Sequence, residues 1–436
     1  MNLPIIKKME FKIALIGAGS RGTQYSSHAL KHGGTKIVAV VDPNEFRRNI
    51  AAEKFNIDPK NCFPGVDELL ERGVEFDGVI NGTMDNMHVK TTLPLLQRGK
   101  CVMLEKPMCL NKDELFELYN TTVKYNAKLM VCHVLRYTPF YSAIKQRVVN
   151  GEIGEIKHIY ASESVANYHM AAAFIRGKWG NSVECGSKIL MAKSCHDMDL
   201  LTWFKSGVRP VKVSSMGSLF EYKAEKAPEG AGKKCLVDCK IESDCPYSAN
   251  LNYLKRDDFD VYSWRAILEK GTDLSGKTIP FEEKVKYLKS DDRFGRCVYY
   301  LDNDQYDTQN VSVQFEDGSV ATFGLDAGTP YGERYIRLEG TKGMIIGQFM
   351  KQQFIIRKPK LDLDEKYTEE VVDINCSLDG HGGGDTRIIG DFINLALGNE
   401  TSISCTSIED SMYGHLIGFN ADISINEERI VRIEKL

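Results

Sequence analysis

Residues near the N-terminus of this sequence have types and spacings that point to nucleotide chemistry. An apolar stretch, residues 12–16, leads directly into Gly17-Ala18-Gly19-Ser20-Arg21-Gly22. A G-x-G-x-x-G loop between a strand and a helix lets the backbone approach a pyrophosphate and lets the helix pack closely on the strand. A plain structural turn is the alternative. We expect residues 17–22 to bind a dinucleotide.

Asp42 indicates which dinucleotide is bound. It ends a second apolar stretch, residues 36–41, and follows the glycine loop by about 20 residues, where such folds hold the adenosine ribose. A carboxylate there accepts hydrogen bonds from ribose hydroxyls and repels a 2′-phosphate. The sequence therefore favours NAD over NADP, although Arg47 and Arg48 lie close enough to moderate the preference.

Lys106 is the first candidate for proton transfer. It lies in Glu105-Lys106-Pro107, directly after the apolar stretch 100–104. The carboxyl ends of strands in a doubly wound sheet face the cofactor crevice, so Glu105 and Lys106 are predicted to lie at the nicotinamide. Positive neighbours lower the pKa of a lysine and make it a usable base. An exposed surface lysine is the alternative.

A polar loop and a histidine supply further candidates. Residues 81–88 follow another apolar stretch, and Thr83 and His88 in this loop are predicted to cover the nicotinamide side, or else to precede the next helix. His196 and Asp199 lie three residues apart, on one face of a predicted helix. A histidine can accept or donate a proton near neutral pH. A structural histidine is the alternative reading of His196.

Polar and aromatic residues farther along the chain are typical of sugar recognition. Tyr168, His169, Arg176 and Trp179 are predicted to bind substrate, and a loop packed on the sheet is the alternative. His381 lies in an unusually glycine-dense run, residues 380–384, which implies a tight backbone path. We expect His381 to reach the substrate, a flexible turn being the alternative.

Four cysteines form a separate candidate site. Cys235-x3-Cys239-x5-Cys245 is followed much later by Cys297. Four thiolates can hold a tetrahedral zinc ion, which would stabilise an otherwise poorly supported loop away from the nicotinamide. The spacing is not the usual C-x2-C, so free thiols are the alternative and an iron–sulfur cluster is a variant.

The elements that position these residues fall into two predicted domains. Strands alternate with helices from about residue 11 to 133, which predicts an α/β Rossmann domain with a doubly wound parallel sheet over residues 1–134. Neighbouring strands around the turn Asp317-Gly318 predict an α+β domain with an open, mainly antiparallel sheet over residues 135–436. This domain is expected to bind substrate and to carry a cysteine-containing insertion near 220–300.

Composition narrows the class of protein. A chain of 436 residues predicts two domains. A net charge of −4 without a basic run argues against nucleic acid as a partner. The sequence has no apolar run of membrane-spanning length and its N-terminus lacks the apolar core of a signal peptide, so we expect a cytoplasmic protein without membrane contact.

The order and spacing of the glycine loop, Glu105-Lys106-Pro107 and His196-Asp197-Met198-Asp199 resemble the Gfo/Idh/MocA family, named for glucose–fructose oxidoreductase and inositol dehydrogenase. The resemblance extends to residues 136–141, where Arg136 is predicted to contact substrate, and to 340–343. It implies nicotinamide-dependent oxidation or reduction of sugars and polyols, and oligomers joined through the sheets. Lys106 matches the active-site lysine of the family and His196 its histidine. Many members carry an aspartate four residues before that histidine. This chain has Ala192 there, and Lys193 is the predicted substitute.

The predicted function is an NAD-dependent oxidoreductase acting on a hydroxyl of a carbohydrate, glycoside or polyol, as a homo-oligomer (dimer or tetramer). One alternative is an NAD-dependent glycoside hydrolase that oxidises, eliminates, adds water and reduces again. His169, Arg176, Lys193 and His381 would suit such acid–base work. A second alternative is a non-catalytic cofactor-binding protein.

Overall fold

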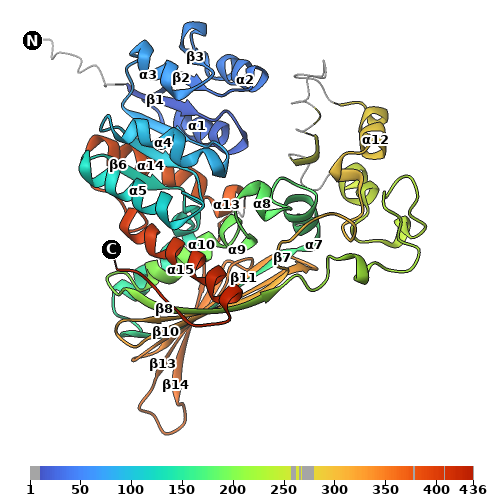
Figure 1. Cartoon of the computed structure of the whole chain (residues 1–436). Coiled ribbons are helices and arrows are strands. Elements are labelled where there is room, and N and C mark those ends of the chain that lie inside the picture. Colours follow the sequence, from blue (N-terminus) through green and yellow to red (C-terminus); the bar gives the residue numbers. More distant parts are fainter. Residues whose placement is uncertain are drawn as a thin grey trace, which may run out of the picture. The chain divides into compact units, whose positions relative to one another are not determined.

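The protein folds into two units, shown in Figure 1. The computed structural model describes residues 10–256, 262–264, 267, 279–376, 379–406 and 408–435. Unit 1 comprises residues 1–142 and 376–412, and unit 2 comprises residues 143–375 and 413–436. The boundary predicted at residue 134 therefore lies close to residue 142, where the chain first passes from unit 1 to unit 2. The sequence did not predict that residues 376–412 return to unit 1.

Unit 1 is built on the predicted parallel sheet. Six strands lie in the order β3-β2-β1-β4-β5-β6, and every neighbouring pair is parallel. The strands are β1 (Phe11–Ile16), β2 (Thr35–Val41), β3 (Cys62–Phe63), β4 (Gly78–Asn81), β5 (Cys101–Leu104) and β6 (Lys128–Val131). Because β1 and β4 are neighbours while β2 follows β1 on its other side, the order reverses at β1, which is where such sheets bind ligands.

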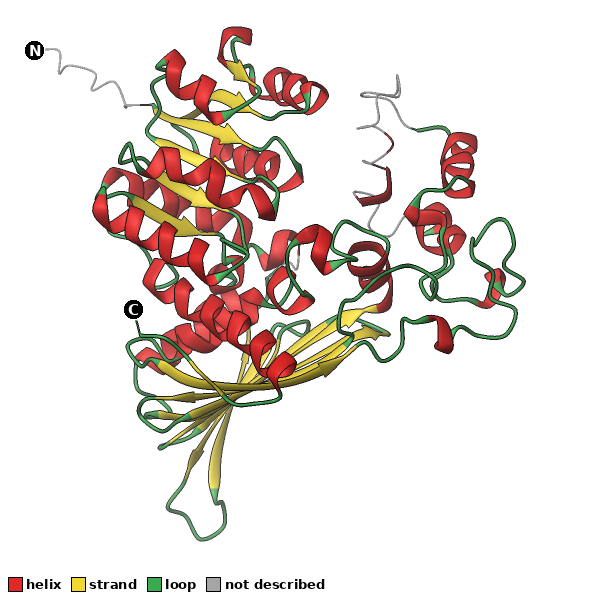
Figure 2. Ribbon diagram, viewed as in Figure 1, coloured by secondary structure: helices red, strands yellow, loops and turns green. Residues whose placement is uncertain are grey.

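Helices cover both faces of this sheet (Figure 2). They are α1 (Ser20–His32), α2 (Glu45–Phe55), α3 (Val66–Arg72), α4 (His88–Leu96), α5 (Lys112–Lys124), α13 (Asp379–Gly382) and α14 (Gly384–Leu397). Helix α5 begins after Asn111, whose side chain accepts a hydrogen bond from the Glu114 amide at 2.9 Å.

Helix α14 joins unit 1 because its apolar face completes the core of this unit. Ile388, Ile389 and Phe392 are fully buried in the cluster that also contains Ile13 and Leu15 of β1. Burying each such side chain contributes about 1.5–3 kcal/mol. Lys128 at the start of β6 adds a 2.7 Å hydrogen bond to the Leu395 carbonyl oxygen.

Unit 2 contains a nine-stranded sheet in the order β14-β13-β12-β11-β7-β10-β9-β8-β15. Neighbours are antiparallel except for β7 and β10, which are parallel. The strands are β7 (Ile156–Ala166), β8 (Pro210–Ser218), β9 (Thr308–Phe315), β10 (Val320–Thr329), β11 (Glu333–Gly340), β12 (Met344–Gln348), β13 (Gln353–Pro359), β14 (Tyr367–Asp373) and β15 (Val431–Arg432). The predicted neighbouring strands around Asp317-Gly318 are confirmed as the hairpin β9–β10, and residues 340–343 lie at the turn of a second hairpin, β11–β12.

The remaining helices are α6 (Pro139–Val149), α7 (Asn167–His169), α8 (Ser182–Cys185), α9 (Ile189–Ala192), α10 (Cys195–Phe204), α12 (Phe281–Lys289) and α15 (Ile408–Glu427). A π-helical turn, Met170–Ile175, continues α7. The insertion between β8 and β9 is mostly irregular and has a small core of its own that includes Tyr253, Leu288 and Phe294. Within the described residues, no helix is both long and apolar enough to cross a membrane.

Candidate functional site

The glycine loop of unit 1 has the geometry of a phosphate-binding turn. Gly17 has φ +81°, and a Cβ there would lie 2.6 Å from the Thr83 nitrogen. A Cβ at Gly22 would lie 2.2 Å from the Gly17 oxygen, so α1 packs directly on the loop. At Gly19 the nearest atom would be the Gly82 oxygen at 3.8 Å, which leaves space above the backbone. Helix α1 begins there without an acidic residue in its first turn, so its positive end suits a pyrophosphate.

Asp42 binds the backbone of this loop through its side chain. Its buried carboxylate accepts hydrogen bonds from the Ala18 nitrogen and the Asn44 nitrogen, each at 2.9 Å. It also forms an ion pair with Arg47, with 3.0 Å between Nη2 and Oδ1. Arg48 donates to the Asp42 carbonyl oxygen at 2.7 Å. The carboxylate therefore stands at the position expected for a ribose contact, with a cation beside it.

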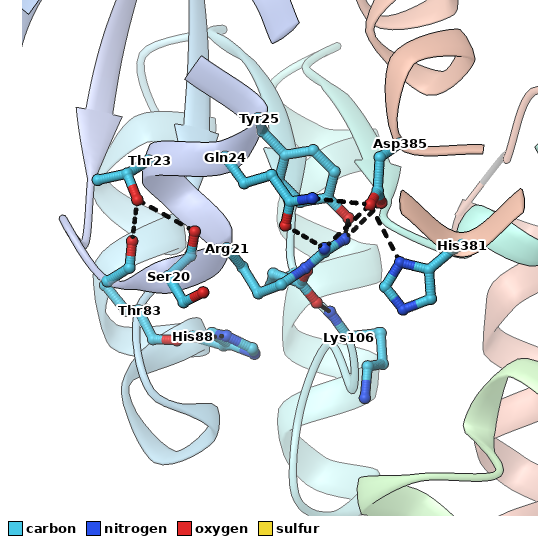
Figure 3. Close-up of polar contacts among 12 residues, drawn as sticks. Ser20, Arg21, Thr23, Gln24, Tyr25, Thr83, His88, Lys106, His381 and Asp385 are labelled. Carbon is cyan, nitrogen blue, oxygen red and sulfur yellow. Dashed lines mark hydrogen bonds and ion pairs between the residues drawn. The ribbon is translucent and has the colours of Figure 1, made fainter. Parts of the chain in front are cut away.

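An ion-pair network ties the glycine loop to two distant segments (Figure 3). Arg21 Nε lies 2.8 Å from Glu105 Oε1, and Arg21 Nη2 lies 2.7 Å from Asp385 Oδ1 in α14. Burial alone would raise the pKa of Asp385, but His381 and Arg21 hold it well below its ordinary value. Arg21 and Glu105 were predicted to contact the cofactor, and here their charged groups are engaged with each other.

Lys106 follows β5 at the edge of this network. Its backbone nitrogen donates to Glu105 Oε2 at 2.8 Å, and its peptide bond to Pro107 is cis. The side chain is partly exposed. In Figure 3 its ammonium group points away from the Arg21 network. The Arg21–Glu105 pair thus fixes the backbone of Lys106 relative to the glycine loop and leaves its amine outside the pair.

His88 has a different surrounding from the predicted one. It is fully buried, and its Nδ1 and Nε2 lie 2.7 Å from the Pro107 oxygen and 3.2 Å from the Thr83 oxygen. In this structure the ring is held between two backbone carbonyls, and a cofactor contact of His88 stays a prediction. The ring joins the Thr83 loop to the turn after Lys106, and it begins α4. Thr83 is partly exposed and donates to Asn81 Oδ1 at 2.9 Å.

His381, also in unit 1, lies between its glycines with a φ of +53°. Its Nδ1 lies 3.1 Å from Asp385 Oδ2, and nearly half of its side chain is exposed. The prediction of a substrate contact stays open for this residue, since the ring is held on one side and accessible on the other.

Unit 2 contains a buried cluster of four charges that the sequence did not reveal. Lys193 Nζ lies 2.6 Å from Glu163 Oε1. Arg334 pairs with Glu163 and also with Asp197, with 2.9 Å between Nε and Oδ1. Glu163 lies on β7 and Arg334 directly opposite it on β11, so the register of the two strands creates the pair. The Ser194 hydroxyl donates to Glu163 Oε2 at 2.9 Å.

The charges in this cluster shift one another's protonation. Burial raises the pKa of Asp197, and Arg334 only partly opposes the rise. Burial would raise the pKa of Glu163 as well, but Arg334 and Lys193 outweigh it and lower that pKa. Burial lowers the pKa of Lys193, against the attraction of Glu163. The cluster thus combines a carboxyl that retains its proton more readily with an amine that releases its proton more readily.

His196 begins the first turn of α10 next to this cluster in sequence and is largely buried. Tyr168 and His169 are partly exposed on α7. The His169 ring lies 5.7 Å from Phe174, and Phe174 stacks on the partly exposed Trp179 at 5.9 Å. Three of the predicted substrate residues therefore lie close together, on α7 and the turn that follows it.

Two arginines predicted to bind substrate are buried instead. Arg176 is 1% exposed and donates to the carbonyl oxygens of Arg296 and Tyr247, each at 2.8 Å. Its Nη2 also lies 3.5 Å from Cys235 Sγ. Arg136 is fully buried, and its carbonyl oxygen accepts from the Ser404 hydroxyl at 2.8 Å. Both side chains are buried in this structure, and their contacts with a substrate stay predictions.

The four cysteines of the predicted zinc site lie around one cavity. Cys235, Cys239, Cys245 and Cys297 line it together with Arg176 and Tyr247. All four are free thiols. As they stand, the described residues contain no group of three or more His, Cys, Asp or Glu side chains arranged to hold a metal ion.

Comparison with known proteins assigns this chain to a family. The model of an oxidoreductase family with an NAD-binding Rossmann fold matches residues 11–133, and that of its C-terminal alpha/beta domain matches residues 145–433. The chain belongs to the Gfo/Idh/MocA oxidoreductase family. The putative oxidoreductase YteT of Bacillus subtilis is 24% identical over 368 residues, which cover 82% of this chain and 81% of YteT.

Other relatives match over shorter segments. The scyllo-inositol 2-dehydrogenase (NAD(+)) of Bacillus subtilis is 26% identical over 217 residues, 48% of this chain and 58% of that protein. Among solved structures, a levoglucosan dehydrogenase in complex with NADH superimposes with a TM-score of 0.69 at 16% identity, covering 98% of this chain and 100% of that one. A putative NADPH-dependent oxidoreductase from Desulfitobacterium hafniense has a TM-score of 0.65 at 16% identity, covering 99% and 98%. These two likenesses show the fold.

Proposed function

We propose that this member of the Gfo/Idh/MocA family is an NAD-dependent dehydrogenase that acts on a hydroxyl group of a carbohydrate, glycoside or polyol. The observation that carries the proposal is the Arg21–Glu105 ion pair. It ties the turn of Lys106 to the dinucleotide loop, which supports a role for the Lys106 amine beside the cofactor. The sugar and polyol dehydrogenases among the relatives support the substrate class.

The glycine loop, the start of α1 and Asp42 are the residues that would hold NAD. The open backbone above Gly19 fits a pyrophosphate, and the Asp42 carboxylate fits a ribose. When bound, the nicotinamide accepts or donates the hydride. Arg47 beside Asp42 would weaken the rejection of a 2′-phosphate, so we propose NAD as the preferred cofactor and NADP as a poor substitute.

Lys106 would take the proton of the substrate hydroxyl as the hydride leaves its carbon. The amine serves as a base only in its neutral form. In unit 2, His196 and Lys193 are the proposed acid–base partners, with Lys193 in place of the aspartate absent at Ala192. Glu163 positions the amine of Lys193 at 2.6 Å and balances its charge when protonated.

The partly exposed side chains of Tyr168, His169 and Trp179 would bind the sugar through ring faces and hydrogen bonds. His381 is the proposed contact from unit 1. We also propose a homo-oligomer, dimer or tetramer, joined through the nine-stranded sheet, where Tyr160 and Tyr335 leave exposed rings on β7 and β11. Light scattering on the purified chain tests the assembly.

A panel of sugars, glycosides and inositols tests the activity. The purified protein is incubated with NAD and each compound, and NADH formation is followed by absorbance. The proposal predicts turnover with at least one compound and its loss in Lys106→Ala. Lys90→Ala, an exposed lysine on α4, is the matched control and should keep full activity. If no compound is oxidised with NAD and no oxidised counterpart is reduced with NADH, the dehydrogenase proposal fails.

The charge cluster around Glu163 favours a second candidate, the NAD-dependent glycoside hydrolase. Elimination and water addition need both a protonated acid and a base, and Asp197 with a raised pKa beside Lys193 with a lowered pKa would offer both. Hydrolysis in deuterated water distinguishes the candidates. Deuterium at the carbon next to the anomeric centre without net NADH supports the hydrolase, whereas free NADH with an oxidised sugar supports the dehydrogenase.

A further inference from the structure

The insertion of unit 2 brings four cysteines from two separate segments to one place. The Cys235 nitrogen donates to the Gly295 oxygen and the Cys297 nitrogen to the Lys233 oxygen, each at 2.9 Å. Lys234 and Arg296 form an antiparallel bridge between these bonds. The two backbone segments therefore run side by side and hold Cys297 next to Cys235. The intervening loop returns Cys239 and Cys245 to the same cavity.

The cavity that these residues surround is small, about 10 Å³, which is roughly the room of one water-sized sphere. Its other lining residues include Arg176, Tyr247 and Tyr299. Four thiols around one cavity give it the ligand set of a tetrathiolate zinc site or of an iron–sulfur cluster.

The charge of the cavity wall also favours a metal centre held by thiolates. Arg176 is buried, and in the described part of the chain its guanidinium donates to two carbonyl oxygens, the Tyr253 hydroxyl and Cys235 Sγ. None of these groups is a carboxylate. A buried cation without a counter-charge is costly. Four thiolates around Zn²⁺, or around a cluster core of the same charge, carry a net charge of about −2, which Arg176 would partly offset.

The thiols surround the cavity without converging on a single point, since no three of them are placed to hold one ion as they stand. A cubic iron–sulfur cluster, whose cysteine ligands bind separate iron atoms at its corners, would require the cavity to widen. A zinc ion would require the side chains to turn inward, which rotation about χ1 allows.

The position of the cavity gives such a centre a structural task. The small core of the insertion includes Cys235 and also Ala172 of the π-helical turn Met170–Ile175. That turn follows Tyr168 and His169 and carries Phe174, which stacks on Trp179. Anchoring the insertion would therefore hold the segment that carries the aromatic residues of the proposed substrate site.

We propose that Cys235, Cys239, Cys245 and Cys297 hold a structural metal centre through four thiolates, with Arg176 as its buried counter-charge. The centre takes no part in hydride transfer. It replaces the extended apolar core that the irregular insertion lacks, and removal of the metal loosens the insertion before the rest of unit 2.

Metal and sulfide analysis of the full chain, purified without oxygen and without added metal, tests the proposal. The expected result is either about one zinc per chain without sulfide, or about four irons and four sulfides with broad visible absorption. Both results support the four-thiolate centre and tell the two metals apart. Less than about one-tenth of these amounts, before and after reconstitution with zinc or with iron and sulfide, would overturn it.

Variants locate the metal. Cys239→Ser and Cys297→Ser should each lose the metal, while Cys62→Ser, in unit 1, should retain it. Retention of full metal content by both cluster variants would contradict the assignment. If a variant does not fold, treating the wild-type protein with a chelator gives the same information. Metal loss should then lower the melting temperature and expose Cys239 and Cys245 to a thiol reagent, as mapped by mass spectrometry. Unchanged labelling of these two cysteines would count against the centre.

Discussion

Arg21 of the glycine loop and Asp385 of α14 form an ion pair across 364 positions of sequence, with 2.7 Å between Nη2 and Oδ1. Arg21 simultaneously binds Glu105, the neighbour of Lys106. One guanidinium thus connects the cofactor loop, the lysine turn and the glycine-dense segment that carries His381. The geometry of the proposed cofactor site depends on this connection.

Asp385→Asn should destabilise unit 1 and weaken NADH binding. Removing the Asp385 carboxylate leaves Glu105 as the carboxylate that pairs with Arg21. We expect a loss of roughly 3 kcal/mol in the free energy of unfolding. Chemical denaturation and NADH fluorescence titration measure the two effects. Asp364→Asn, an exposed residue of unit 2, is the control. Unchanged stability and affinity in Asp385→Asn would show that the pair does not organise the site.

The same pair predicts a pH dependence of stability. The pKa of Asp385 in the folded protein lies below its ordinary value, so its contribution is present above the ordinary aspartate pKa of about 3.9 and is lost as the pH falls below it. Comparing the melting temperature of wild type and Asp385→Asn from pH 7 downward should show a gap that narrows in acid. A gap that widens in acid has the wrong sign for this account.

Lys106→Ala should lower kcat by about 10²- to 10⁴-fold, the usual size of a general-base contribution. The affinity for NADH should change little, because the Arg21–Glu105 pair and the glycine loop remain. Lys106→Arg should be similarly inactive, since a guanidinium does not lose its proton. If Lys106→Ala and His196→Ala both retain wild-type turnover on the true substrate, the catalytic assignment of these two residues fails.

Glu163 should control the pH profile of turnover through Lys193. Burial lowers the pKa of Lys193, and Glu163 opposes that shift, so replacing Glu163 removes an attraction for the protonated amine. In Glu163→Gln the rising limb of kcat/KM should move to lower pH, and Glu163→Asp should restore it in part. A purely structural role would lower activity without moving the limb. Lys193→Met should remove the part of the limb that Glu163 controls and leave the part that is due to Lys106.

Arg47 should set the tolerance for NADP. In Arg47→Ala the Asp42 carboxylate loses its ion pair and would repel a 2′-phosphate without compensation. The ratio of kcat/KM for NAD to that for NADP should rise about tenfold, equivalent to about 1.4 kcal/mol. Asp42→Ala should lower the same ratio. An unchanged ratio in both variants would show that these side chains do not contact the ribose.

The sequence predicted the elements whose signals are local. The glycine loop and the hairpin at Asp317-Gly318 depend on neighbouring residues, and both are confirmed. The sequence did not predict that the segment 376–412 completes the core of unit 1, because its apolar residues carry no sign of which core they complete. The pair Glu163–Arg334 depends on the register of β7 with β11, which sequence spacing does not determine.

The sequence did not predict that several candidate site residues are buried. Arg176 and Arg136 lie in segments rich in polar and aromatic residues, which is a pattern shared by binding sites and by buried hydrogen-bonded networks. Only the packing around each guanidinium distinguishes the two. The same holds for His88, whose buried ring bridges two backbone loops. By contrast, the four cysteines were predicted as a group, and one cavity brings them together.

The most direct test of the central claim follows the hydrogen itself. The protein is incubated with NAD and a substrate from the panel that carries deuterium on its carbinol carbon, and the cofactor is analysed by mass spectrometry. The account predicts deuterium on the nicotinamide of the NADH that forms, and no transfer in Lys106→Ala. Substrate turnover without deuterium on the nicotinamide would contradict it.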